Sequence, residues 1–308
     1  MLLCTHSLDT MTNPKGKKTT VPASKKRKGA ALSSGPTAEI RHPFLQFPPG
    51  PQEELFQILR SRPLGVGRCI DWTSLEQIQL ADAIWALLTT DLWGLFFEII
   101  ESTYLELTLE LCSTFHLQVI MTEFDDPKMV QFYLSGLVRQ LSIPEFGVAL
   151  GLYIEKFMDD DDFVSLQRHI HYSLSNCWKA LVPTSTMYDP SRSKASALVP
   201  SLRYLHTLLA HTLTGRREST GVINTCDAYF LRSMVYGQVF DLAYFITLTI
   251  RHQTEWYRKG VISIDPYVTR LAWYICLLNM AAQASSLSFI SQMSPQGISS
   301  MLHMRMIK

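Results

Sequence analysis

The sequence VQFYLSGLVRQLSIPEFGVALGL, residues 130–152, holds two short segments of strand-like composition, a turn and the start of a helix. Residues 130–134 and 137–141 have the composition of β-strands, and Ser135-Gly136 between them is a turn signal. Pro144 and Glu145 follow directly, and both residues are favoured in the first turn of a helix. This stretch therefore predicts a β-hairpin at about residues 130–141, followed by a short helix.

The segments around this hairpin have mostly helical spacing. Apolar side chains three and four residues apart predict helices, and a third strand is expected before the hairpin. A capping box at Ser74–Gln77 marks one helix start. The expected helices are 52–61, 74–88, 91–100, 103–115, 200–212, 227–252, 265–284 and 294–306; the third strand is 118–123, and 158–196 is loop-rich. The predicted fold class is mainly α, a helical domain with a small β-hairpin.

Charge is distributed unevenly along the 308 residues. Hydrophobic residues make up 47% of the chain, which excludes wholesale disorder, and the formal net charge is +1. Residues 1–50 carry eight Lys and Arg against two acids, whereas the remainder carries a net charge of −5. We therefore expect a disordered basic arm over residues 1–43 and a mildly acidic helical body over residues 44–308.

The arm contains two basic clusters separated by six residues. Such clusters bind the acidic grooves of nuclear import receptors, or phosphates. We expect nuclear localisation, with some protein in the cytoplasm, and weak nucleic-acid contact through the arm; Met11 is an alternative start to Met1. The cluster residues are Lys15, Lys17, Lys18, Lys25, Lys26, Arg27 and Lys28.

Cysteine spacing and apolar run length argue against cofactor, metal and membrane partners. No pair of the six cysteines has zinc-ligand spacing, which favours reduced thiols. His169, His171 and Cys177 form the one metal-like cluster, and it lacks an evident fourth ligand. The most apolar run, residues 239–250, contains Asp241 and is too short to cross a bilayer. We expect no cofactor, no metal and no membrane partner.

Enzymatic motifs are weak or missing. Residues 157–160, Phe-Met-Asp-Asp, match the metal-binding hairpin of reverse transcriptases, but Asp161 and Asp162 follow where a strand needs apolar residues. A solvated acidic loop is the simpler interpretation. No glycine-rich phosphate loop with lysine and no Gly-x-Ser-x-Gly motif is present. The chain is therefore predicted not to be an enzyme.

One cluster in the body combines cations with aromatic side chains, as single-stranded nucleic-acid sites do. It consists of Arg251, His252, Trp256, Tyr257, Arg258 and Lys259. The alternative is an ordinary helix C-terminus, where cations lie near the negative end of the helix dipole. The other tryptophans fall mostly within helical spacing and are expected in the core.

Five separated phrases carry a resemblance to a known family. They are Phe47–Phe56, Pro63–Trp72, Phe115–Leu117, Leu141–Leu152 and Met293–Met301. Together they resemble the putative plant transposon proteins and the C-terminal domain of the Athila-type retrotransposon first-open-reading-frame (Orf1) protein. The hairpin and the following helix also resemble the plant mobile domain.

This resemblance covers roughly residues 44–307. It implies a mobile-element origin and a nuclear context, and it supplies no characterised active site. Relatives usually continue beyond residue 308, so a C-terminally truncated copy is expected.

Three functional hypotheses follow. The first is a non-enzymatic, transposon-derived protein with a helical body for protein–protein or self association and an arm for nuclear entry. The second is a gag-like protein that packages element RNA through the arm and the Arg251–Lys259 cluster together. The third is a relic with no selected function. The acidic body favours the first over the second.

Overall fold

The computed structural model divides the chain into two units, Met1–Ile40 and Arg41–Lys308, and describes residues of the second alone. The described residues are 41–88, 91–119, 127–154, 166, 168–182, 188–189, 194–213, 221–279 and 285–303. Most of the predicted arm, with both basic clusters, lies outside them, as do residues 157–160. Arg41 belongs to the body, because its Nη1 lies 2.8 Å from Glu53 Oε1 and its guanidinium carbon lies 4.8 Å from the Phe56 ring centroid.

The hairpin and the helix after it are confirmed. Strands β4 (Pro127–Leu134) and β5 (Leu137–Ser142) pair antiparallel, and positive φ angles at Ser135 (61°) and Gly136 (72°) fit the turn that joins them. Helix α6 (Ile143–Ala149) begins with a reciprocal capping box between Ser142 and Glu145. Strand β3 (His116–Val119) pairs with the other edge of β4.

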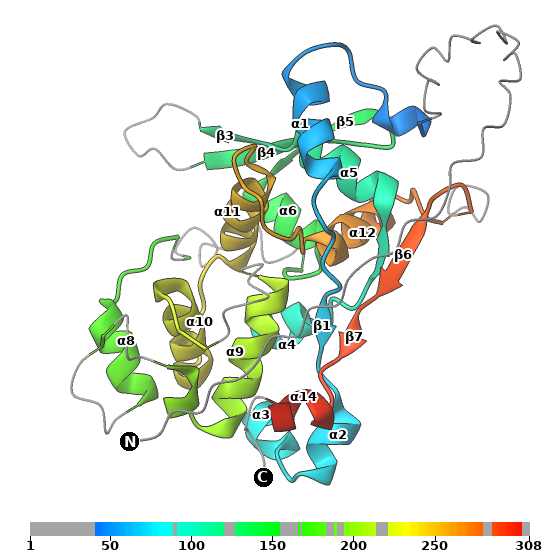
Figure 1. Ribbon diagram of the computed structural model, residues 1–308. Coiled ribbons are helices and arrows are strands. Elements are labelled where there is room, and N and C mark those ends of the chain that lie inside the picture. The colour runs from blue at the N-terminus through cyan, green and yellow to red at the C-terminus, as the bar shows by residue number, and fades with distance from the viewer. Residues whose placement is uncertain are drawn as a thin grey trace, which may run out of the picture. The chain divides into compact units, whose positions relative to one another are not determined.

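Helices account for most of the remaining described elements (Figure 1). Before the hairpin come η1 (Pro43–Leu45), α1 (Pro51–Arg60), α2 (Trp72–Gln77), α3 (Ala81–Leu87), α4 (Asp91–Phe97) and α5 (Leu105–Thr114). After it come α8 (Leu174–Leu181), η3 (Ala195–Ala197), α9 (Pro200–Thr212), α10 (Thr225–Tyr236), α11 (Leu242–Thr254), α12 (Asp265–Tyr274) and α14 (Ile298–His303).

Two predicted helices are split by their own capping residues. The prediction of one helix over 227–252 is wrong, because α10 ends at Gly237 (φ 61°) and Asp241 caps the start of α11. The predicted helix 74–88 is also wrong as a single element. Asp71, rather than Ser74, caps α2, and Gln79 adopts a φ of 56° before α3 begins.

Three further segments differ from the prediction. Helix α8 lies inside the stretch 158–196, which was expected to be loop-rich, and Ser173 caps it. The predicted helix 103–115 begins as strand β2 (Ser102–Tyr104). The predicted helix from Ser294 is replaced by β7 (Ser294–Pro295) and then α14, because this segment pairs with other strands.

Strand pairing joins the two ends of the body. Strand β6 (Phe289–Gln292) pairs antiparallel with β2, and β7 pairs parallel with β1 (Arg68–Cys69). Buried Glu106 accepts hydrogen bonds from the backbone N and Oγ of Ser288, at 2.7 and 2.6 Å. The C-terminal segment is thereby fixed against elements more than 180 residues earlier.

One continuous hydrophobic core joins these elements. Helix α5 is buried along its whole length and contacts α1, β4, α11 and α12. Ring contacts link Trp93 of α4 to Phe230 of α10 and to Phe240, which in turn stacks on Phe230. In the part of the chain that the structure describes, no helix is long and apolar enough to span a bilayer.

Candidate interaction site

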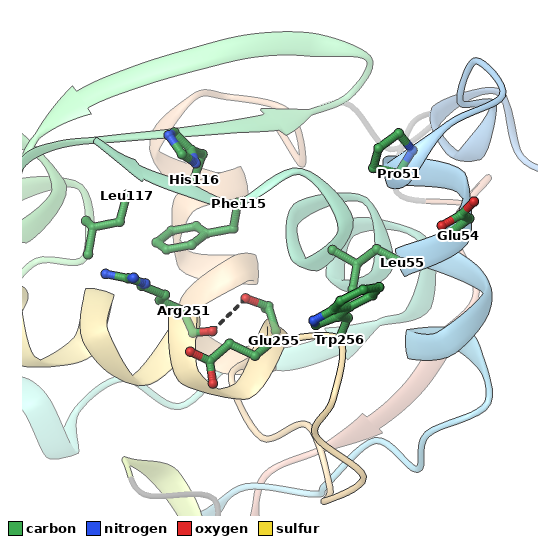
Figure 2. Close-up of a pocket in the computed structure, with 10 residues that line it drawn as sticks. Pro51, Glu54, Leu55, Phe115, His116, Leu117, Arg251, Glu255 and Trp256 are labelled. Atoms are coloured by element: carbon green, nitrogen blue, oxygen red, sulfur yellow. Dashed lines mark hydrogen bonds between the residues drawn. The ribbon is translucent and has the colours of Figure 1, made fainter. Parts of the chain in front are cut away.

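A pocket of about 470 Å³ opens between α1, the α5–β3 junction and the end of α11 (Figure 2). Helix α1 contributes one wall, the junction contributes a second, and α11 with the turn after it contributes the third. The apolar lining is Pro51, Leu55, Phe115, Leu117 and Trp256; the polar lining is Glu54, His116, Arg251, Thr254 and Glu255. The pocket is therefore apolar with polar groups of both charges.

The predicted cluster lies beside this pocket. Arg251 and His252 occupy the last turn of α11, and Trp256, Tyr257, Arg258 and Lys259 follow it. Trp256 and Tyr257 are 67% and 62% exposed, whereas the expectation that the other tryptophans lie in the core is wrong for Trp85 and Trp273, which are exposed as well. Of the six cluster residues, Arg251 and Trp256 line the pocket.

Glu255, an acidic side chain, lies within the cluster and contacts two of its basic residues. Glu255 Oε2 lies 3.5 Å from Arg258 Nε and 3.7 Å from His252 Nδ1. Hydrogen bonds from Tyr257 and Arg258 lower the pKa of Glu255, so its carboxylate is charged at neutral pH. His252, Tyr257 and Arg258, three of the six cluster residues, therefore contact the Glu255 carboxylate. This negative charge makes the cluster less basic than its sequence suggests.

Hydrogen bonds of buried side chains hold the turn that carries Trp256. Arg62, which is buried, donates from Nε to Gly260 O at 2.8 Å and from Nη1 to Gln253 O at 2.6 Å. Gln253 Oε1 accepts from Ser263 N at 2.8 Å, and Thr254 Oγ1 donates to Arg251 O at 3.1 Å (Figure 2). These bonds fix both ends of the turn, so the exposed rings stand on a rigid base.

The metal-like cluster of the sequence does not form a metal site among the described residues. Within the described ranges, no group of three or more His, Cys, Asp and Glu side chains lies close enough to hold a metal ion. His171 Nδ1 lies 3.3 Å from the backbone oxygen of His169. Cys177 is buried in α8, and burial raises the pKa of its thiol, which disfavours the thiolate that a metal needs.

Sequence reasoning missed the other walls of the pocket. Leu55 and Phe115 are separated from Trp256 by more than 130 residues, and their periodicity matches ordinary core residues. No local signal marks them as pocket residues, because the tertiary contact between α1 and α5 brings them together.

The described part of the chain is a helical protein with three small sheets and a surface pocket that has both apolar and polar lining. The ATHILA ORF-1 family matches residues 48–238, which is more than half of the chain. The chain belongs to the ATHILA ORF-1 family and is an Athila-type retrotransposon protein.

Four of the five phrases that carried the resemblance fall wholly or almost wholly within the matched range, and the phrase at 293–301 lies outside it. The resemblance to the plant mobile domain stays a prediction. No curated protein and no solved structure matches the chain.

Proposed function

We propose that this chain is a non-enzymatic Orf1 protein whose helical body binds other proteins, including second copies of itself. One observation carries the proposal: Trp256, 67% exposed, stands at an apolar pocket of about 470 Å³ on a rigid turn. Exposed tryptophans at pockets are typical anchors of protein interfaces. The volume falls in the range of roughly 300–1,000 Å³ that suits a buried ligand group.

The charges around the pocket favour a protein over a nucleic acid. Glu54 and Glu255 line it together with Arg251, and Glu255 also neutralises part of the neighbouring cluster. Carboxylates repel phosphates, whereas a rim of both signs is typical of protein surfaces. An apolar side chain of a partner, flanked by polar groups, fits this lining.

Self-association can be tested with the chain alone by analytical ultracentrifugation over a concentration series. We expect a concentration-dependent oligomer that Trp256→Ala weakens about thirtyfold or more, because truncating a central aromatic anchor costs about 2 kcal/mol or more. Trp85→Ala is the matched control. Trp85 is 58% exposed and stacks on Trp72 at 4.4 Å, away from the pocket lining.

A chain that stays monomeric at every concentration would contradict self-association. Equal loss in Trp256→Ala and Trp85→Ala would contradict the pocket as its site. A melting temperature for each variant shows whether the fold is retained.

The arm is proposed to supply nuclear entry and weak nucleic-acid contact. Support comes from the two basic clusters of the sequence, since paired short basic runs fit the acidic grooves of import receptors. Replacing Lys15, Lys17, Lys18, Lys25, Lys26, Arg27 and Lys28 by Gln in a fluorescent fusion should lower the nuclear-to-cytoplasmic ratio. An unchanged ratio would remove this part of the proposal.

The gag-like alternative keeps one supporting observation. Trp256 and Tyr257 are exposed beside Arg251, Arg258 and Lys259, as in sites that stack bases. Oligonucleotide binding that survives neutralisation of the arm, and falls when Arg251 and Lys259 are replaced by Gln, would put this function first.

A further inference from the structure

A second pocket, of about 480 Å³, lies between α8 and α10. Among the described residues its lining is Tyr172, Asn176, Lys179, Ala180, Arg232 and Tyr236, which offer two cations and two phenol rings and include no carboxylate. This composition sets it apart from the Trp256 pocket, where two glutamates are part of the lining. We call it the α8–α10 pocket.

The Arg232 guanidinium lies against both rings. Its guanidinium carbon lies 3.6 Å from the ring centroid of Tyr172 and 4.8 Å from that of Tyr236. Gln238 accepts a hydrogen bond from Arg232 Nη1 and donates one from Nε2 to the Tyr172 hydroxyl at 3.0 Å. The guanidinium plane is therefore fixed before any ligand arrives, which lowers the entropy cost of binding.

The two cations of this pocket form no ion pair with a carboxylate of the described residues. Arg41, Arg168, Arg258 and Arg270 each pair with a carboxylate. Neither Arg232 nor Lys179 does so with any residue of the described ranges. Asp227, the one acid of α10, is fully buried and lies 3.1 Å from His206 Nε2.

We infer that the α8–α10 pocket binds single-stranded nucleic acid. Arg232 and Lys179 would contact the phosphates, and an unstacked base would lie on the ring of Tyr236, which is 57% exposed. A duplex keeps its bases stacked inside and cannot present one to this pocket. The inference uses residues separate from the Trp256 pocket, so it stands or fails apart from the proposed protein association.

The test is fluorescence polarisation with the full chain in which the seven arm cations are replaced by Gln, so that the arm does not mask the body. The probes are fluorescein-labelled oligouridine, oligothymidine and a DNA duplex of equal length, each across a salt series. We expect both single strands to bind better than the duplex. A preference for oligouridine would further identify RNA as the ligand.

Variants in the pocket separate stacking from charge. Tyr236→Ala should weaken oligouridine binding about five- to a hundredfold, the range of one base-stacking contact. Arg232→Ala should weaken it as well, because it removes a phosphate contact and the cation that lies against the Tyr236 ring. Tyr236→Phe keeps the ring and should bind as the parent does. Lys179→Gln should reduce the slope of log K against log salt by about one.

Lys194→Gln is the matched control, since it removes one exposed cation that lines neither this pocket nor the Trp256 pocket. It should leave binding unchanged, and melting temperatures should show that each variant is folded. The inference is overturned if folded Arg232→Ala binds as the parent does, or if Lys194→Gln loses as much as Lys179→Gln. Equal affinity for the duplex, or equal competition by inorganic phosphate at matched phosphate concentration, would also overturn it.

Discussion

Glu110 is a buried carboxyl that holds the turn of the hairpin. It lies on α5, is fully buried, and accepts hydrogen bonds from the backbone N–H groups of Ser135 at 2.7 Å and Gly136 at 2.6 Å. Thr114 of the same helix accepts from Tyr133 N at 2.8 Å. Burial raises the pKa of Glu110 to about 7, against the lowering effect of those two hydrogen bonds.

This shift predicts how the free energy of unfolding varies with pH. Between the ordinary value of 4.5 and about 7, the folded chain keeps the Glu110 proton that the unfolded chain has lost. Stability therefore falls as pH rises through this window, by at most about 3 kcal/mol. Urea unfolding at several pH values should show a smaller decrease in Glu110→Gln than in the parent. An identical pH dependence in the two proteins would refute the assignment.

Gly147 allows α6 to approach its neighbours closely. A Cβ at this position would lie 2.3 Å from two ring atoms of Tyr153 and 3.1 Å from the Cβ of Ala243. We expect Gly147→Ala to destabilise the fold by about 1–3 kcal/mol, because overpacking outweighs the gain in helix propensity. Thermal unfolding measures this change. Gly260→Ala, where a Cβ meets open space, should be nearly neutral.

At the scale of elements, the break between α10 and α11 is fixed by Asp241. Its Oδ1 accepts from Tyr244 N and from the Tyr153 hydroxyl, both at 3.0 Å, and its Oδ2 lies 2.9 Å from Arg168 Nε. One buried side chain thus caps α11 and joins it to the segments after α6. Apolar periodicity runs through this position and gave no sign of the break.

Replacing Asp241 tests the role of this junction. Asp241→Ala should destabilise the fold by about 3 kcal/mol, since it removes a helix cap and leaves buried partners unpaired. Asp241→Asn should lose less, because an amide oxygen can still cap. Asp71→Ala is the control: Asp71 caps α2 through Ser74 N at 3.0 Å and forms no ion pair with a basic side chain of the described residues, so about 1 kcal/mol is expected. Equal losses in urea unfolding of Asp71→Ala and Asp241→Ala would contradict this account.

At the scale of the whole molecule, the core extends beyond the residues that the family matches. Residues 48–238 exclude α11 and α12, although Ile246 and Ile250 of α11 and Val268 of α12 are fully buried in the common core. Strands β6 and β7, which pair with β2 and β1, are excluded as well. The matched region is therefore part of a larger folding unit.

A fragment of residues 48–238 should consequently fail to fold cooperatively. The fragment would expose the apolar faces that α11 and α12 cover. The free energy gained by burying those faces exceeds the 5–15 kcal/mol or so by which domains are usually stable, so the fragment cannot do without it. We expect the full chain to give a sigmoidal thermal transition by circular dichroism and the fragment to give none. A cooperative transition in the fragment would show that the C-terminal elements are accessory.

The sequence by itself determined part of the local structure of this protein. The Ser135-Gly136 turn, the capping box at Ser142 and the helices around 52–61 and 200–212 follow from short-range rules, because their hydrogen bonds close within a few residues. The separated phrases also determined the family, which the match over residues 48–238 confirms.

Tertiary structure decided the rest. Strands β6 and β7 exist because segments far away in the chain offer them partners. The two pockets form between α1, the α5–β3 junction and α11, and between α8 and α10. Arg232 and Tyr172 are 60 residues apart, so no local pattern could reveal their stacking. The physical reason is the range of the interactions: caps and turns act between near neighbours, whereas pairing, burial and pocket formation depend on which distant elements meet.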